Sequence, residues 1–251
     1  MEWLHFPTGI ESAVGWGIVA LALVTAMISA LFGLGGGTIL LAAMAILLPP
    51  LAVIPVHGVV QIGSNFGRAL LMLRHVRYDT LLPFAIGTGL GSTASGLLLF
   101  EIPPWTIQYA VAGFIFWSVF GKTPAMSANH VVAAGAFSGF LTIMVGATGP
   151  FIAAFVKGMS MPRLSHVATQ AAMMVLQHGL KIAVFGFLGF SFGPYMFLIS
   201  MMLLSGFVGT VIGRHFLGRM GEHNFRPWLN TILIVLALRL IWQATKAATA
   251  G

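Results

Sequence analysis

Uninterrupted apolar runs restrict the fold of this sequence more than any other feature. The runs 12–32 and 193–213, for example, contain no charged residue. About 20 apolar residues in a helix span the hydrocarbon core of a bilayer, which is roughly 30 Å thick. Only 7% of the residues are charged, whereas a soluble domain has about 25%. The chain is therefore predicted to be an all-α polytopic membrane protein.

Ten apolar segments are predicted, with proline or glycine at most of the joins. They cover residues 12–32, 37–49, 55–75, 80–100, 104–120, 129–146, 150–159, 163–189, 193–213 and 226–245. The acidic start, MEWLHFPTGIE, lacks the basic region of a signal peptide, so the first segment is expected to be a retained helix. Whether the short second and seventh segments span the membrane or re-enter stays open.

Basic residues gather on one side of these ten segments. The loops after the third, fifth, seventh and ninth segments, with their helix ends, hold Arg74, Arg77, Lys122, Lys157, Arg163, Arg214, Arg219 and Arg226. Cytoplasmic loops of membrane proteins are enriched in Lys and Arg. The asymmetry predicts a multi-pass protein of the cell (inner) membrane with both termini outside. It also accounts for the net charge of +7, so nucleic acid is not an expected partner.

The second half of the chain repeats the first at an offset of 112 residues. At this offset Gly37 aligns with Gly149, Asn65 with Gln177, and Gly67 with Gly179. We interpret the chain as one membrane domain of two repeats, about 12–122 and about 129–246. Each repeat has five segments, so the second would be inverted in the membrane, a common plan of secondary transporters. Chance matching in apolar sequence is the alternative.

Two of the predicted helices carry a polar stripe that ends in a cation. The first stripe contains His57, Gln61, Ser64, Asn65 and Arg68, and the second contains His166, Gln170, Gln177 and Lys181. Helical spacing places each set on one face, which lipid would penalise. No Asp or Glu lies in the middle of any segment, so a substrate anion is expected to supply the opposite charge.

Two alternatives to this anion site stay open. Arg68 lies six residues from Arg74, and its long side chain would reach the membrane interface by snorkelling. Gln61 and Gln170 would serve as hydrogen-bonding contacts between packed helices.

Glycine-rich turns open the two short segments. The first turn, LFGLGGGTILL at 31–41, contains Gly33, Gly35, Gly36 and Gly37, followed by Thr38. The second, MVGATGPFIAA at 144–154, contains Thr148 and Gly149. A helix N-terminus offers unpaired N–H groups and a positive dipole end to an anion. Tight helix packing is the alternative reading, and it is the one we prefer for the runs Gly87/Gly91/Ser95 and Ser205/Gly209/Gly213.

Three histidines lie in or near the apolar segments, namely His57, His166 and His178. Histidine titrates near neutral pH, so proton coupling stays open. His178 is predicted to point off the stripe of its helix, and the set lacks the convergent spacing of a metal site. The chain has no cysteine, which excludes thiolate chemistry and Cys-ligated metal. Neither a metal nor a cofactor is expected.

In order and in duplicate, these motifs resemble the TauE/SafE family of membrane anion permeases. The resemblance rests on GLGGGTILL, on LRHVRYDTLLP after the polar third segment, on the second turn ending Gly149-Pro150, and on RLSHVATQ at 163–170. It covers about residues 12–245 and implies transport of sulfite, sulfonates or sulfoacetate. The second turn, with Ala147 and Thr148 before Gly149, departs from the family's usual glycine pair and brings the Thr148 hydroxyl into consideration.

The preferred hypothesis is a secondary transporter that works by alternating access around a cationic site between the repeats. Its expected substrate ligands are Arg68, Lys181, Asn65, Gln177, Gly36, Gly37, Thr38, Thr148, Gly149, Gln61, Gln170, His57 and His166. An enzyme is not expected, because the chain lacks G-x-S-x-G, HExxH and paired carboxylates. A structural or assembly protein and a permease for another small organic anion are the alternatives. The sequence leaves open the particular anion, the direction of transport, the coupling ion and homo-oligomer formation.

Overall fold

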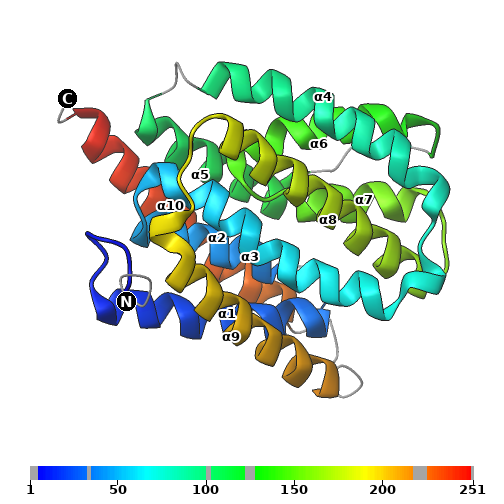
Figure 1. Ribbon diagram of the computed structural model, residues 1–251, viewed down its shortest axis with the longest axis horizontal. Helices are drawn as coiled ribbons and strands as arrows, with labels where there is room; N and C mark the ends of the chain where they lie inside the picture. Colours follow the sequence, from blue (N-terminus) through cyan, green and yellow to red (C-terminus); the bar gives the residue numbers. More distant parts are fainter. Residues whose placement is uncertain (1–4, 33–34, 100–102, 122–127, 217–224, 250–251) are drawn as a thin grey trace.

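The computed structural model describes residues 5–32, 35–99, 103–121, 128–216 and 225–249 (Figure 1). Several residues used in the sequence interpretation lie outside these ranges. They are Gly33 of the first turn and the basic loop residues Lys122 and Arg219.

Ten α-helices account for most of the described residues, and each coincides with one predicted segment. They are α1 (Ser12–Phe32), α2 (Gly36–Leu47), α3 (Pro50–Leu71), α4 (Leu81–Leu99), α5 (Pro104–Phe120), α6 (Val131–Val145), α7 (Gly149–Gly158), α8 (Arg163–Phe187), α9 (Met196–Phe216) and α10 (Phe225–Thr249). Four 3₁₀ turns lie at Leu73–His75 (η1), Tyr78–Thr80 (η2), Ala128–His130 (η3) and Gly193–Tyr195 (η4). The described ranges contain no strand.

The start of α3 differs most from the prediction. The helix begins at Pro50 rather than at residue 55, and Pro55 lies inside it. Proline suits the first helical position, because its missing N–H would have no partner there and its φ is already helical. Pro50 therefore starts α3 five residues earlier than the apolar pattern indicated.

Within the described parts of the chain, four helices are long and apolar enough to cross a membrane by length and composition, namely α1, α4, α9 and α10. Large apolar side chains on their outer faces are exposed, for example Leu90 of α4 and Phe207 of α9, which are 65% and 68% exposed. Such surfaces are suited to lipid rather than water. Helices α3 and α8 are equally long, but they carry the polar stripes.

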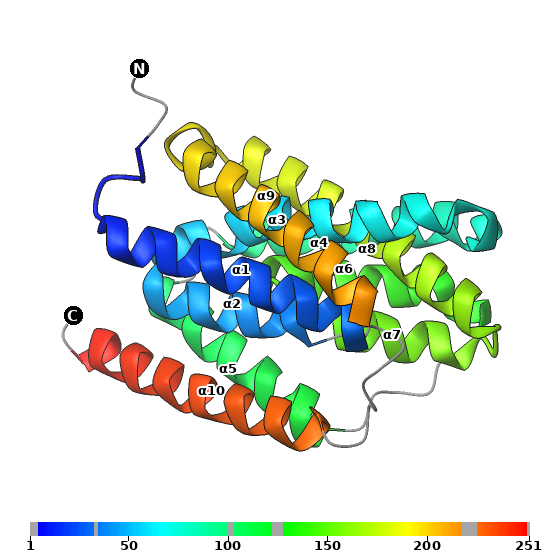
Figure 2. The same ribbon diagram turned by 90° about the horizontal axis from the view of Figure 1, so that it is seen from below.

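The two polar-stripe helices, α3 and α8, pack against each other in the middle of the molecule. The pair α4–α6 flanks them on one side and the pair α1–α9 on the other (Figure 1). Figure 2 shows α5 and α10 side by side beneath α2, and both contact it. The short helix α2 is therefore largely enclosed by other helices, and most of its residues are buried.

Glycines let the flanking helices approach to backbone contact. A Cβ on Gly87 or Gly91 of α4 would collide with backbone oxygens of α6, and one on Gly209 of α9 would collide with the oxygen of Leu23 in α1. The hydroxyl of Ser205 also donates to the oxygen of Val19 across the second pair. The prediction that these two small-residue runs serve packing is confirmed.

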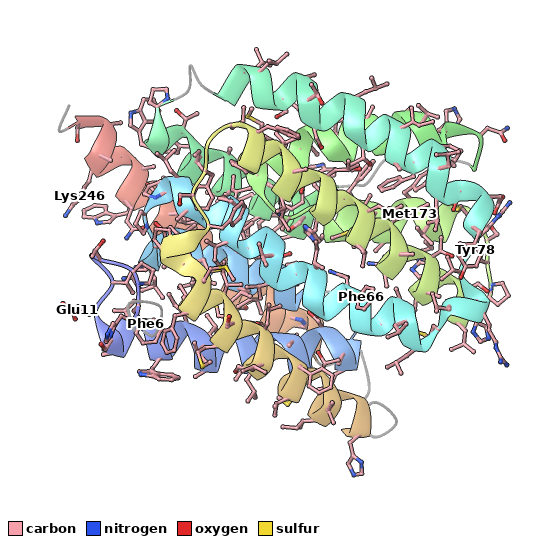
Figure 3. All side chains as sticks on the ribbon, in the orientation of Figure 1. Phe6, Glu11, Phe66, Tyr78, Met173 and Lys246 are labelled. Carbon is pink, nitrogen blue, oxygen red and sulfur yellow. The ribbon has the colours of Figure 1, made fainter. Side chains whose placement is uncertain are left out.

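The two ends of the helix bundle differ in what they carry. Helix α1 begins and α10 ends at the same side, where Glu11 and Lys246 lie, whereas Tyr78 lies at the opposite end (Figure 3). Next to Tyr78, Arg77 forms an exposed salt bridge with Asp79, at 3.2 Å. The basic connection between α3 and α4 is thus at the end remote from these two helix ends.

Candidate functional site

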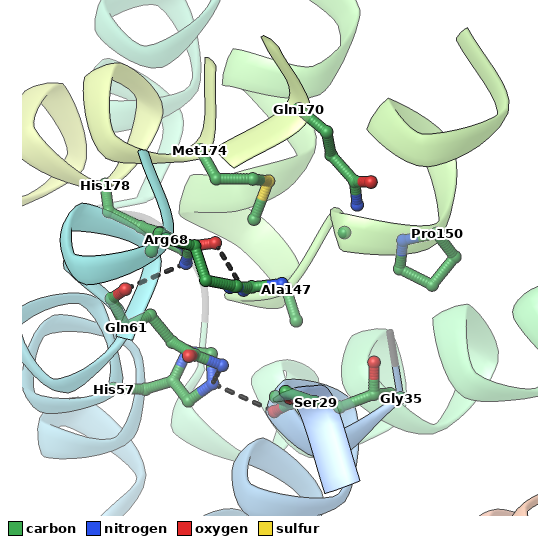
Figure 4. A pocket seen from close by; sticks show the side chains of 14 residues that line it. Ser29, Gly35, His57, Gln61, Arg68, Ala147, Pro150, Gln170, Met174 and His178 are labelled. Carbon is green, nitrogen blue, oxygen red and sulfur yellow. Dashed lines mark hydrogen bonds between the residues drawn. The ribbon is translucent and has the colours of Figure 1, made fainter. Parts of the chain in front are cut away.

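A polar pocket lies where α3 and α8 meet the two glycine turns (Figure 4). The space in it that the centre of a water-sized sphere can occupy is about 40 Å³, so the pocket is small. Its lining comprises Ser29, Gly35, Gly37, Thr38, His57, Gln61, Asn65, Arg68, Ala147, Gly149, Pro150, Gln170, Met174 and His178. The structure therefore brings both turns, which are 112 residues apart in sequence, to one site.

The Arg68 side chain is held within the pocket by its own helix. Its Nη2 donates to Oδ1 of Asn65 at 2.7 Å, and Nδ2 of Asn65 donates to the backbone oxygen of Gln61 at 2.8 Å. Asn65 is buried. A guanidinium bonded one turn back along the helix points away from the next turn, so the geometry favours the pocket over snorkelling toward Arg74.

His57 and Gln61 hold the first turn against α3. Nε2 of His57 lies 2.9 Å from the backbone oxygen of Gly37 and 3.1 Å from Nε2 of Gln61. A Cβ on Gly37 would collide with the Gln61 amide. Because residue 37 is a glycine, the side-chain amide of Gln61 can lie directly against the start of α2.

Helix α2 begins inside the protein with its N-terminus at the pocket. Gly35 precedes it with φ of 98° and forms no side-chain cap, and this left-handed conformation favours glycine. The first amide groups of a helix have no partner within it, so the N–H groups of Gly36, Gly37 and Thr38 are available near the pocket. Gly36 and the hydroxyl-bearing Thr38 are both buried.

The second turn is held by α8 in a different way. Nζ of the fully buried Lys181 donates to the backbone oxygen of Gly146 at 2.8 Å. Nε2 of Gln177 donates to Oγ1 of Thr148 at 2.7 Å and to the backbone oxygen of Ser138 at 2.8 Å. Three polar groups predicted for the anion are thus engaged in fixing the turn before α7.

The N-terminus of α7 offers fewer donors than that of α2. Its first two residues are Gly149 and Pro150, and proline has no N–H. The pocket is therefore asymmetric, with its guanidinium and its richer set of amide donors on the side of the first half.

Of the thirteen predicted ligands, the structure places most around the pocket. Those on its lining are Arg68, Asn65, Gln61, His57, Gly37, Thr38, Gly149 and Gln170. Those outside its lining are Lys181, Gln177, Thr148, Gly36 and His166. His166 is partly exposed near the start of α8. For all thirteen residues, contact with an anion remains a prediction.

Sequence reasoning missed several residues on the lining. Ser29, Ala147 and Met174 join it, and so does His178, which was predicted to lie off the polar stripe of α8 and was not included among the ligands. More than one face of α8 bears polar contacts, because the helix packs against α3 on one side and against α4, α6 and α7 on others. Gln177 faces Ser138 of α6, and the next residue, His178, faces α3. Neighbouring residues in a helix point about 100° apart. The polar pair Gln177 and His178 therefore indicated that two different faces of α8 make polar contacts.

The charges around the pocket suit an anion. Within the described ranges no carboxylate lines it, while Arg68 and the histidines His57 and His178 do. The same ranges contain no group of three His, Asp or Glu side chains that would hold a metal ion. Hydrogen-bond donors and a positive charge in a water-poor site bind oxyanions well.

Comparisons with known proteins point to membrane transport. A family model described as "Sulfite exporter TauE/SafE" matches residues 18–240. The chain is also similar to a "Probable membrane transporter protein ORF9" from Sinorhizobium sp. The two are 26% identical over 230 residues, which cover 84% of this chain and 86% of that protein. No solved structure matches.

Proposed function

The chain belongs to the TauE/SafE family of membrane transporters, and on this premise we propose that it carries a small sulfur-containing oxyanion by alternating access. The observation that carries the proposal is the position of Arg68, whose guanidinium shares one pocket with the N-terminal turns of α2 and α7. A fixed positive charge and helix N-termini together favour a compact anion.

The pocket argues for an anion of few atoms. Its lining is mostly amide, hydroxyl, imidazole and backbone groups, with Met174 as its one large apolar side chain within the described residues. Hydrogen sulfite and short sulfonates each carry one negative charge on a group of three oxygens that accept hydrogen bonds. Sulfite, sulfonates and sulfoacetate are therefore the substrates we expect, with other small organic anions as the alternative.

Helix packing supports two inverted repeats related by the 112-residue offset. In that alignment α1 to α5 correspond to α6 to α10. Helix α4 packs on α6 as α9 packs on α1, and α4 contacts α8 as α9 contacts α3. The equivalent pairs α3–α8 and α5–α10 are themselves in contact, as expected about a two-fold axis.

Alternating access would then move one half against the other around the pocket. The polar stripes lie at the contact between the halves, where such movement opens the site to either face. With the basic connections in the cytoplasm, both termini lie outside the inner membrane.

Uptake into proteoliposomes tests the function. Purified protein should take up labelled sulfite or methanesulfonate, and Arg68→Ala should reduce uptake at subsaturating substrate by about tenfold or more, since a charge-assisted hydrogen bond contributes about 1.5–3 kcal/mol. Arg239→Ala is the matched control, because Arg239 is exposed on α10.

Two outcomes would count against the proposal. Normal uptake by Arg68→Ala would refute the site. Absence of uptake and of thermal stabilisation by every anion in a panel of sulfur and carboxylic oxyanions would favour a structural or assembly role.

A further inference from the structure

Among the residues that the structure describes, His178 is completely buried and has no hydrogen-bond partner. Its side chain is 0% exposed and lines the pocket. Within the described residues neither Nδ1 nor Nε2 has a partner. An imidazole always carries at least one N–H donor, and leaving a buried polar group without a partner costs about 1–3 kcal/mol. The pocket is where a partner for this ring would come from.

The titratable side chains nearest to His178 are all basic. From α3, the His57 ring lies 6.2 Å from it between centroids, edge to face, and Arg68 lines the same pocket. Lys181 is one turn further along α8 and is also fully buried. A proton added to His178 in the empty pocket would place one more positive charge beside these groups.

The remaining elements packed on α8 do not supply a compensating charge. Helices α4 and α6 contain no titratable residue. Lys157 on α7 and Arg74 and His75 on η1 are exposed, and all three are bases. A negative charge next to His178 must therefore come from what binds in the pocket.

We propose that His178 takes up a proton when the anion binds beside Arg68, so that the protein carries the two together. The inference rests on the proposed function and deepens it. The protonated ring donates a hydrogen bond to the anion, and the anion supplies the charge that the pocket lacks. Because linkage is reciprocal, a proton on His178 tightens anion binding by the same factor by which the anion favours the proton.

The other two histidines of the stripes are less suited to this role. Nε2 of His57 is already within 2.9 Å of the Gly37 oxygen, where it holds the first turn. His166 is outside the pocket lining. For a monoanion, one proton carried with each anion makes the transport cycle electrically neutral.

Proton movement with the anion can be measured directly. Methanesulfonate is a suitable probe, because it remains a monoanion across the range from pH 5.5 to 8 and releases no proton itself. In proteoliposomes loaded with a pH-sensitive dye, wild type should acidify the lumen by about one proton per labelled methanesulfonate taken up. An inward proton gradient should accelerate its uptake.

Substitution separates proton coupling from anion binding. His178→Gln keeps a hydrogen-bond donor, so it should still bind methanesulfonate, but its uptake should no longer acidify the lumen or respond to the proton gradient. His75→Gln is the control, because His75 is an exposed histidine on η1, and it should behave like wild type. Equal proton-to-anion ratios in His178→Gln and wild type would overturn the proposal.

A measurement on wild type alone covers the case in which the variant does not fold. Calorimetric titration with methanesulfonate in buffers of different ionisation enthalpy reports the protons taken up on binding. Uptake near one proton per site between pH 6 and 8 would support the proposal, and binding without proton uptake would overturn it while leaving the anion transporter intact. A wild type that neither binds nor transports any oxyanion would instead refute the proposed function itself.

Discussion

Lys181 and Gly146 are joined by a hydrogen bond of 2.8 Å from the ammonium to the backbone oxygen. Gly146 ends α6 with φ of 89°, and a cation at a helix C-terminus interacts favourably with the helix dipole. The side chain reaches this oxygen past Gly58 of α3, where a Cβ would lie 2.7 Å from Cε of Lys181. The second cation of the polar stripes is thus engaged with the backbone.

Lys181→Met should lower stability more than anion affinity. The substitution keeps most of the apolar stem but leaves the buried Gly146 oxygen without its donor, at a cost of about 1–3 kcal/mol. Thermal unfolding in detergent measures the loss, and anion-dependent stabilisation measures binding. A variant with wild-type stability and no anion binding would instead assign Lys181 to the anion.

Asn65→Asp should weaken anion binding more than Asn65→Ala. Alanine removes only the hydrogen bond that orients Arg68, whereas aspartate adds a negative charge that pairs with the guanidinium and repels the anion. We expect a loss of about 1 kcal/mol for alanine and more than about 3 kcal/mol for aspartate. Titration calorimetry with sulfite or methanesulfonate gives both values. Equal losses would argue against Arg68 as the anion's partner.

Alanine in the first turn should be more harmful than in the second. A Cβ at Gly37 collides with the Gln61 amide, whereas one at Gly149 has only the Met174 methyl, 4.0 Å away, within reach. The methyl group would displace the Gln61 amide from the start of α2, and losing one such hydrogen-bonding group costs about 1 kcal/mol, so Gly37→Ala should weaken anion affinity about fivefold. Gly149→Ala should show the smaller loss in the same binding assay. The reverse order would place the main anion contact at the second turn.

Two glycines on α4 provide a matched pair of substitutions that tests how closely α4 packs against α6. Gly91→Ala would place a methyl group against the backbone of α6, while the space around Gly89 is open. Gly91→Ala should destabilise the protein by about 1–3 kcal/mol, and Gly89→Ala should be tolerated. Thermal unfolding compares them. If both are tolerated, α4 and α6 are less closely packed than described.

Single cysteines test the orientation in the membrane, because the chain has none of its own. Glu11→Cys, before α1, should react with an impermeant maleimide added to intact cells. Arg74→Cys, at the other end of the bundle, should react only after the membrane is opened. Both native residues are exposed. The opposite labelling pattern would invert the proposed topology.

The positions of the helices were largely predictable. In a membrane protein each apolar run forms a helix, and prolines and glycines mark the helix ends. Packing of Gly87 and Gly209 was predictable for a similar reason, since small residues at four-residue spacing form one helix face. That both glycine turns reach one pocket was predictable from the apparent repeat in the sequence, and not from either glycine motif alone.

Which polar residues line the pocket and which bind the backbone was not predictable from the sequence. Helical spacing places Lys181 and Gln177 on one stripe, but it does not say which neighbouring helix that stripe meets. In the structure these two side chains turn to the backbone of the second half, at Gly146 and Ser138. His178, one step around the helix, faces the pocket instead. Such assignments depend on how α8 is rotated among its neighbours, which a single-helix pattern does not contain.

The hydrogen bond between Asn65 and Arg68 has a consequence for the affinity with which the pocket can bind the proposed anion. The best small ligands gain at most about −1.5 kcal/mol per non-hydrogen atom. Sulfite, one of the proposed substrates, has four such atoms, so its binding is limited to about −6 kcal/mol, a dissociation constant of about 40 μM. A ligand that small cannot also restrain a flexible arginine. Asn65 already restrains the Arg68 side chain in the folded protein, so the proposed anion would lose none of its small binding free energy to ordering that side chain.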